Sequence, residues 1–149
     1  MAVLPGNFVD VIVSVDARVL GDPSKQIAIL ACRHDLTTGS DSNYRLWVNP
    51  GTSGFLLGRV MRSQFLPLAP WAFSAAIKGG NEMNRLELIC VGDLIAARIN
   101  GQIVGSARDG ALTSGGVWFG ADDDTSTLIG PDVRFDNLEL RGPVKRTRG

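Results

Sequence analysis

The chain has no excess of either charge and no long hydrophobic run, and each absence excludes a class of protein. Its 15 basic and 15 acidic residues give a formal net charge of zero. Nucleic-acid binding through phosphates needs a basic excess on one face, so we expect no nucleic-acid partner. No apolar run approaches the roughly 18 residues of a membrane span. The N-terminal residues "MAVLPGNFVD" also lack the pattern of a signal peptide, so the sequence leaves the compartment unknown.

Residues typical of metal and redox sites are scarce as well. The chain has a single histidine, His34, and its only cysteines are Cys32 and Cys90. The simplest interpretation of the cysteines is two small buried hydrophobic side chains, because each lies inside an apolar strand pattern. A disulfide between them is the alternative. The spacing of the two cysteines in the sequence cannot decide whether their Cα atoms lie within bonding range. These residues give no zinc-ligand spacing, and we expect His34 to be an ordinary residue at a strand end.

Helical periodicity is scarce, whereas an alternation of period two runs through most of the chain. Only "APWAFSAAIKGG", residues 69–80, fits one or two helical turns before its glycines stop it. In "NFVDVIVSVDARVL", the valines from Val9 to Val15 share one face, and Ala17 and Val19 continue it. With 18 glycines in the chain, the pattern predicts about nine or ten strands, mostly joined by hairpins. We therefore expect an all-β, two-layer antiparallel β-sandwich.

The stretch "NRLELICVGDLIAARINGQIVGSARDG", residues 84–110, contains the strongest turn signals. Asn100–Gly101 predicts a type I′ hairpin turn, because that turn needs positive φ at both central residues. Together with the turn at Gly92–Asp93, it predicts a meander of three strands. We expect a single domain over residues 1–149, with a core over about 7–141 and a flexible basic tail over 142–149.

The order of these motifs resembles the concanavalin A-like lectin/glucanase jelly-roll superfamily. The segments that carry the resemblance are "NRLELICVGDLIAARINGQIV", "ARDGALTSGGVWFGA" and "VRFDNLEL", and upstream "FVDVIVSVDARV" and "NYRLWV" also fit. Within the superfamily, the chain is similar to bacterial sugar-hydrolase-like or LamG-like domains of unknown function. The resemblance implies a jelly roll, a carbohydrate ligand, and a place in a larger bacterial protein, commonly outside the cytoplasm.

The glucanase branch of this superfamily uses paired glutamates, and retaining chemistry needs carboxyl groups about 5 Å apart. The glutamates of this chain are Glu82, Glu87 and Glu139, and no E-x-D-x-x-E pattern joins them. Glu82 and Glu87 would face opposite sides of a strand. We therefore expect no catalytic residues and a non-catalytic binding module, with a glycoside hydrolase-like enzyme as the least favoured alternative.

A set of aromatic and arginine side chains could instead bind a glycan. Trp71 and Phe73 are the best candidates for a sugar-stacking platform, because they lie in a segment near prolines that we expect to be irregular. Strand positions that could hydrogen-bond or stack on the same ligand are Tyr44, Arg45, Trp47 and Arg59. Core packing is the expected fate of at least one of the tryptophans Trp47 and Trp118.

The acidic loop "ADDDTST" offers hard oxygen ligands. Asp122, Asp123 and Asp124 are candidate ligands for Ca²⁺, the one cofactor that the sequence suggests. The alternative is a solvated acidic loop between two strands, since the spacing does not match an EF-hand.

The resemblance also implies one or two strands before Phe8, close to the closing "FDN" strand. Only Met1–Asn7 precede Phe8 here, so either "MAVL" forms a short strand or a sheet edge is left uncovered. The strands "FVDVIVSVDARV" and "VRFDNLEL" carry no Pro or Lys to blunt such an edge. We therefore favour association with a second copy or a partner chain through this edge, and a structural assembly module is the main alternative to glycan binding.

Overall fold

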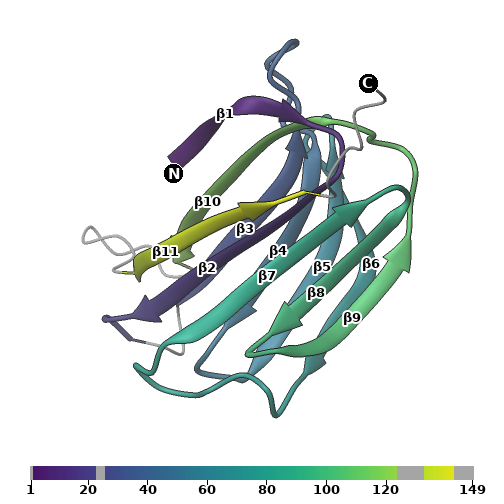
Figure 1. Ribbon diagram of the computed structural model, residues 1–149. Coiled ribbons are helices and arrows are strands. Elements are labelled where there is room, and N and C mark those ends of the chain that lie inside the picture. Colours follow the sequence, from purple (N-terminus) through teal and green to yellow (C-terminus); the bar gives the residue numbers. More distant parts are fainter. Residues whose placement is uncertain (1, 23–25, 124–132, 143–149) are drawn as a thin grey trace, which may run out of the picture.

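The computed structural model describes residues 2–22, 26–123 and 133–142, and these residues form strands, turns and loops (Figure 1). No helix able to cross a membrane occurs among them. The strands are β1 (Ala2–Phe8), β2 (Val11–Val19), β3 (Gln26–His34), β4 (Asn43–Asn49), β5 (Gly54–Met61), β6 (Gln64–Phe73), β7 (Asn84–Val91), β8 (Leu94–Ile99), β9 (Gln102–Arg108), β10 (Gly115–Asp123) and β11 (Val133–Arg141).

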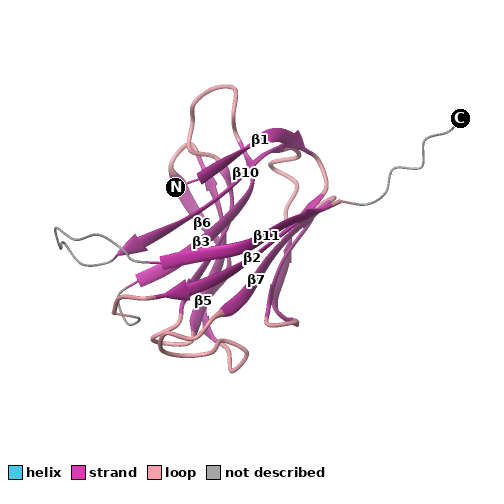
Figure 2. Ribbon diagram, turned by 60° about the vertical axis from the view of Figure 1, so that its left-hand side comes forward, coloured by secondary structure: helices cyan, strands magenta, loops and turns pink. Residues whose placement is uncertain are grey.

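The strands form two antiparallel sheets that pack face to face (Figures 1 and 2). The six-stranded sheet has the order β1-β10-β3-β4-β5-β6, and the five-stranded sheet has the order β11-β2-β7-β8-β9. The expected β-sandwich is therefore confirmed. Figure 1 shows the five-stranded sheet in front of the six-stranded sheet, so the two outer faces point away from each other.

The core lies between the sheets and follows the alternation of the sequence. Val11, Val13 and Val15 of β2 are at most 1% exposed, as expected for a strand with one buried face. The alternating residues of β7 and β8 complete the same layer: Leu86, Leu88, Cys90, Ile95, Ala97 and Ile99. Val9 continues the alternation of Val11, Val13 and Val15, but it is 51% exposed because it lies in the turn between β1 and β2.

Cys32 and Cys90 form a disulfide that links the two sheets through the core. Cys32 lies on β3 and Cys90 on β7, their Cα atoms are 6.7 Å apart, and both side chains are fully buried. The simpler expectation of two unpaired hydrophobic cysteines is therefore wrong. The alternation of each strand determines that the cysteines point inward, but only the stacking of the sheets brings the two strands opposite each other.

Two local expectations are also wrong. The segment 69–80 does not begin a helix, since β6 continues to Phe73 and turns follow it. The expected single strand from Phe8 to Val19 is divided, since β1 ends at Phe8 and β2 begins at Val11. In both places tertiary pairing overrides the local pattern.

The first strand answers the question of the uncovered edge. Ala2, Val3 and Leu4 pair with β10, so the alternative of a short strand in "MAVL" is confirmed. Of the two strands that we expected to border an open edge, β2 lies between β11 and β7, whereas β11 ends its sheet. Self-association itself stays a prediction, because β1, β6, β9 and β11 end the two sheets within the described residues.

The turn prediction is confirmed at Asn100–Gly101. Both residues have positive φ, 50° and 84°, between the paired strands β8 and β9. The Asn100 side chain also accepts a hydrogen bond from the Arg85 amide and donates to the Ala76 carbonyl, each at 2.8 Å. The turn therefore anchors the loop that leads from β6 into β7.

Candidate ligand-binding site

The outer face of the six-stranded sheet carries a set of aromatic and polar side chains. On β4, Leu46 and Val48 point into the core, so the alternation sends Arg45 and Trp47 to the outer face. Arg45 lies opposite Ala31 of β3, and Ala31 lies opposite Trp118 of β10. Three strands that are distant in the sequence therefore place Trp118, Arg45 and Trp47 on one surface.

Arg45 is the central residue of this surface. Its guanidinium carbon lies 4.7 Å from the ring centroid of Trp118 and 5.7 Å from that of Trp47, which is the range of cation–π contacts. Arg45 also forms an ion pair with Asp41, and its Nε donates to Asn43 Oδ1 at 2.7 Å. The aromatic faces and these two hydrogen bonds hold the guanidinium in one orientation.

The aromatic rings extend from Trp47 towards β6. The rings of Trp47 and Phe65 meet edge to face with centroids 5.2 Å apart. Phe65 is 46% exposed, whereas Trp118 is only 4% exposed. The expectation that at least one tryptophan packs away from solvent is met by Trp118. Its indole Nε1 is buried and has no hydrogen-bond partner among the described residues.

A hollow of about 410 Å³ opens beside Arg45 and Trp118. It is lined by His34, Asp35, Gly39, Ser40, Asp41, Arg45 and Trp118. The imidazole of His34 meets the Trp118 ring edge to face, with centroids 6.3 Å apart, and its Nδ1 lies 3.0 Å from the Asn43 amide nitrogen. His34 is the last residue of β3, as expected, but it lines this hollow, which its position in the sequence did not indicate.

The loop between β3 and β4 forms one wall of the hollow and is ordered by Asp35. The Asp35 carboxylate accepts hydrogen bonds from the amide and hydroxyl of Thr37, both at 2.9 Å, and from the hydroxyls of Thr38 and Ser40. These hydrogen bonds, above all the one from the Thr38 hydroxyl, hold the pKa of Asp35 well below its usual range. Asp35 therefore stays charged and keeps the wall in place.

A second and larger hollow is bordered by the same loop. Its volume is about 950 Å³, and its walls come from the loop 35–42, the turn at Met61–Arg62 and the segment 111–115. Arg33 is one of its lining residues, but this guanidinium is used structurally. It is 1% exposed and donates to the carbonyls of Val9, Gly92 and Leu112 at 2.7–3.0 Å.

Trp71 and Phe73 lie on the edge strand β6 and not in an irregular segment, so that expectation is corrected. They are 51% and 74% exposed. Phe73 lies opposite Gly54 of β5, and the Trp71 ring covers the same glycine. Because the neighbour of Gly54, Phe55, points into the core, the two aromatic residues belong to the outer face that carries Trp47.

The other two residues expected at the site, Tyr44 and Arg59, face inward. Tyr44 is fully buried, and its hydroxyl donates to Asp109 Oδ1 at 2.5 Å. Arg59 lies opposite Tyr44 on β5 and donates to Asp109 Oδ2 at 2.6 Å. Both residues lie on strands, as expected, but their side chains are on the inner face of the six-stranded sheet and not on the outer face. They hold one end of the sandwich and do not reach the outer face.

The calcium candidates lie at the end of β10. Asp122 is exposed, Asp123 is the last residue of the strand, and Asp124 lies outside the described residues. Among residues that the structure describes, no group of three or more His, Cys, Asp or Glu side chains could hold a metal ion. Because Asp124 is not among them, calcium binding stays a prediction.

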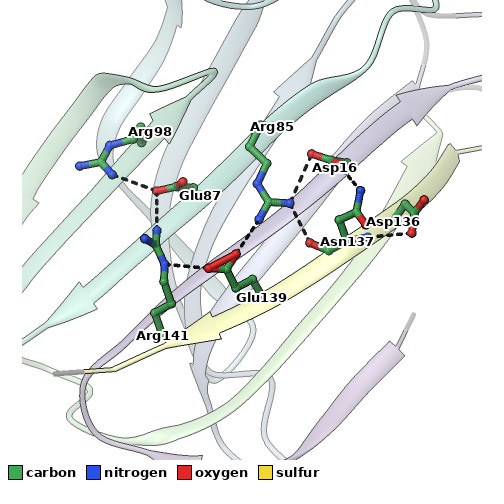
Figure 3. A network of polar contacts seen from close by, with 8 residues as sticks. All are labelled: Asp16, Arg85, Glu87, Arg98, Asp136, Asn137, Glu139 and Arg141. Atoms are coloured by element: carbon green, nitrogen blue, oxygen red, sulfur yellow. Dashed lines mark hydrogen bonds and ion pairs between the residues drawn. The ribbon is translucent and has the colours of Figure 1, made fainter. Parts of the chain in front are cut away.

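Two of the three glutamates of the chain, Glu87 and Glu139, are ion-pair partners on the opposite sheet (Figure 3). Glu87 accepts hydrogen bonds from Arg98 and Arg141 at 3.1 and 3.4 Å, and Glu139 pairs with Arg85 at 3.4 Å. Figure 3 shows this network on the outer face of the five-stranded sheet, where it joins the edge strand β11 to β7 and β8. These side chains have a structural role that accounts for their charge.

No protein-family profile and no curated protein sequence matches the chain. Solved structures do match it. A carbohydrate-binding module, CBM66 from Bacillus subtilis, has a TM-score of 0.71 at 15% identity, covering 92% of this chain and 78% of the module. A variant of human galectin-16 has a TM-score of 0.67 at 11% identity, covering 95% of each chain.

An enzyme shares the same architecture. A family 7 alginate lyase has a TM-score of 0.64 at 11% identity, covering 90% of this chain and 62% of the lyase. At such identities the likeness establishes the fold and not the activity. With its paired sheets of six and five strands, the chain has the concanavalin A-like jelly-roll fold that the order of its motifs implied.

Proposed function

We propose that the chain is a non-catalytic carbohydrate-binding module and that its ligand binds the outer face of the six-stranded sheet. The observation that carries this proposal is the arrangement around Arg45. A guanidinium held over Trp118 and beside Trp47 borders a hollow of about 410 Å³. Small-molecule sites typically combine such apolar walls with a few fixed polar groups.

The chemistry of a sugar ring fits these groups. One side of a pyranose or furanose ring presents C–H groups, which pack on aromatic rings such as Trp47 and Phe65. Its hydroxyl groups need planar donors and acceptors, and His34, Asp41 and Arg45 provide them at the hollow. The buried Nε1 of Trp118 has no partner among the described residues, so a ligand hydroxyl that reached it would satisfy a donor.

The neighbouring folds support the proposal in part. One of them is named as a carbohydrate-binding module and another as an alginate lyase, so both binding and catalysis occur on this architecture. We favour binding because Glu87 and Glu139 are held in ion pairs on the other sheet. A structural assembly module, which self-associates or docks a partner chain through an open sheet edge, is the alternative.

Glycan-array binding followed by calorimetry on the best ligand tests the proposal. We expect Arg45→Ala and Trp47→Ala to weaken binding at least about tenfold, which corresponds to one side-chain contact of ~1.4 kcal/mol. Arg108→Ala is the matched control, because Arg108 is an exposed arginine of the five-stranded sheet that pairs with Asp93. Equal affinities for wild type, Arg45→Ala and the control would overturn the site, and no binding to any glycan would overturn the function.

We further propose that the chain folds in an oxidising compartment, outside a reducing cytoplasm. The disulfide between Cys32 and Cys90 supports this location, because such bonds form and persist where thiols are not kept reduced. The resemblance to modules that are commonly extracytoplasmic points the same way. A thiol count on the native protein tests it: two free thiols in the folded state would contradict the proposal.

A further inference from the structure

Beyond the hollow, the outer face continues as a row of exposed aromatic side chains along β6. Phe65, Trp71 and Phe73 are 46%, 51% and 74% exposed. Solvated aromatic residues that gather on one face usually mark a binding surface. Neither Trp71 nor Phe73 lines the hollow beside Arg45. The exposure of these two side chains therefore needs a separate explanation.

Two glycines of β5 make room for these rings. A Cβ atom at Gly54 would lie 3.3 Å from the Trp71 ring. A Cβ at Gly58 would collide with the ring of Phe65. Each ring is therefore held close to the β5 backbone and has limited freedom before any ligand arrives. Rigid aromatic groups of this kind lose little conformational entropy on binding.

The spacing of the glycines gives the length of the aromatic platform formed by Phe65, Trp71 and Phe73. Gly54 and Gly58 are four positions apart on one strand, which corresponds to roughly 13 Å at the usual rise per residue. A single sugar ring cannot cover both the Phe65 and the Trp71 rings over that distance, whereas an extended oligosaccharide can. The platform also begins beside the hollow, because Phe65 contacts Trp47.

The charges along β6 and at the hollow beside Arg45 favour a neutral ligand. The β6 sequence, QFLPLAPWAF, contains no acidic or basic residue. At the hollow, the charge of Arg45 is matched by Asp41, and Asp35 remains a carboxylate because its pKa is lowered by the hydroxyls and amides of its own loop. An anionic sugar would have to displace Asp41 from Arg45 and would lie near a second carboxylate.

An added strand from another protein fits this edge poorly. Pro67 and Pro70 interrupt the row of backbone donors of β6, which lies at the end of its sheet. Prolines at an edge reduce pairing with a further strand. The exposed side chains, and not the backbone, are therefore the groups available for binding here.

We infer, on the basis of the proposed function, that the ligand is an extended segment of a neutral polysaccharide. Its chain lies along β6, with one end at the Arg45 hollow and the other over Trp71 and Phe73. The proximal half of the site, Arg45 with Trp47, binds the first sugar units. The distal half, Trp71 with Phe73, contacts only ligands that are long enough to reach it.

The test uses length series of neutral oligosaccharides, from disaccharide to octasaccharide, of glucan, fructan, galactan, mannan and xylan type. A matching series of uronic-acid oligosaccharides is measured in parallel by calorimetry. We expect affinity to rise with length in one neutral series until the platform is covered. Phe73→Ala and Trp71→Ala should then weaken binding of the long oligosaccharides about tenfold and leave the disaccharide unaffected.

Controls separate this inference from the proposed function and from a loss of folding. Phe73 is largely exposed, so Phe73→Ala should fold normally, and Trp71→Phe retains a ring over Gly54. Ile103→Ala on β9, the edge strand of the five-stranded sheet, is a control for removing an exposed apolar side chain.

Affinity that is independent of length, a preference for uronates, or no effect of Phe73→Ala and Trp71→Ala on long ligands would overturn the inference while glycan binding stands. A concentration-dependent assembly that Phe73→Ala abolishes would assign the row to a protein interface and also overturn it. Failure of every series would overturn the inference, and only the absence of binding on the whole glycan array as well would overturn the proposed function.

Discussion

The hydroxyl of Tyr44 donates a hydrogen bond to Asp109 Oδ1 at 2.5 Å, which joins β4 to the segment that follows β9. The same hydroxyl accepts a hydrogen bond from the Leu112 amide at 3.1 Å. Burial and the neighbouring carboxylate of Asp109 raise the pKa of Tyr44 from 10.0 to about 12. The chain has only one tyrosine, so every tyrosine signal in solution reports on this contact.

The first prediction concerns the titration of Tyr44. Its pKa is higher in the folded state than in the unfolded state, so its contribution to stability is present below pH 10 and is lost as the pH rises from about 10 to about 12. Ultraviolet absorbance of the ionised phenol should show a midpoint near the upper value in native protein and near the lower one in denaturant. Coinciding midpoints would contradict the burial of this hydroxyl.

The second prediction concerns the Asn100–Gly101 turn. Gly101→Val should lower the free energy of unfolding by about 1–2 kcal/mol, because the left-handed region is unfavourable for residues with a Cβ. No atom lies within 4 Å of the position of an added Cβ, so the loss comes from the backbone and not from a clash. Denaturant unfolding measures it, with Gln102→Val, at an exposed strand position, as the control. A loss below about 0.5 kcal/mol would indicate a different loop.

The third prediction concerns the disulfide. Cys32 and Cys90 are 58 positions apart, and closing a loop of that length stabilises a folded chain by about 4 kcal/mol in the chain-entropy description. Reduction should therefore lower the free energy of unfolding by an amount of that order. A Cys32→Ala/Cys90→Ala variant should be insensitive to reductant, and equal stability of the oxidised and reduced wild type would contradict the prediction.

The fourth prediction concerns Arg33, whose guanidinium donates to the carbonyls of Val9, Gly92 and Leu112. Arg33→Met should lower the free energy of unfolding by at least about 2 kcal/mol, since buried acceptors that lose a partner cost about 1–3 kcal/mol each. Arg108→Met is the matched control: Arg108 is 71% exposed, so its exposed ion pair should matter little. Similar losses in the two variants would show that Arg33 does not hold these three segments together.

Much of the fold could be predicted from the sequence, because alternation and turn residues act locally. The valines of β2 and the alternating residues of β7 and β8 point into the core as their period indicated. Asn100 and Gly101 adopt positive φ because few other residue pairs tolerate it so well. The strand β1 could not be predicted with the same certainty. Its Pro5 and Gly6 are unfavourable in a strand, and the segment is a strand because it pairs with β10.

The candidate site could be predicted only in part, and the physical reason is the order of the strands. The alternation of β4 places Arg45 and Trp47 on one face and Tyr44 on the other, but it does not say which face is the core. That choice is made when the second sheet covers Tyr44. Trp118 reaches Arg45 only because β10 pairs with β3, a contact between residues far apart in the sequence. The sequence by itself therefore determined most of the strands, their turns and the inward cysteines, whereas tertiary structure decided which aromatic side chains meet and which arginine reaches the outer face.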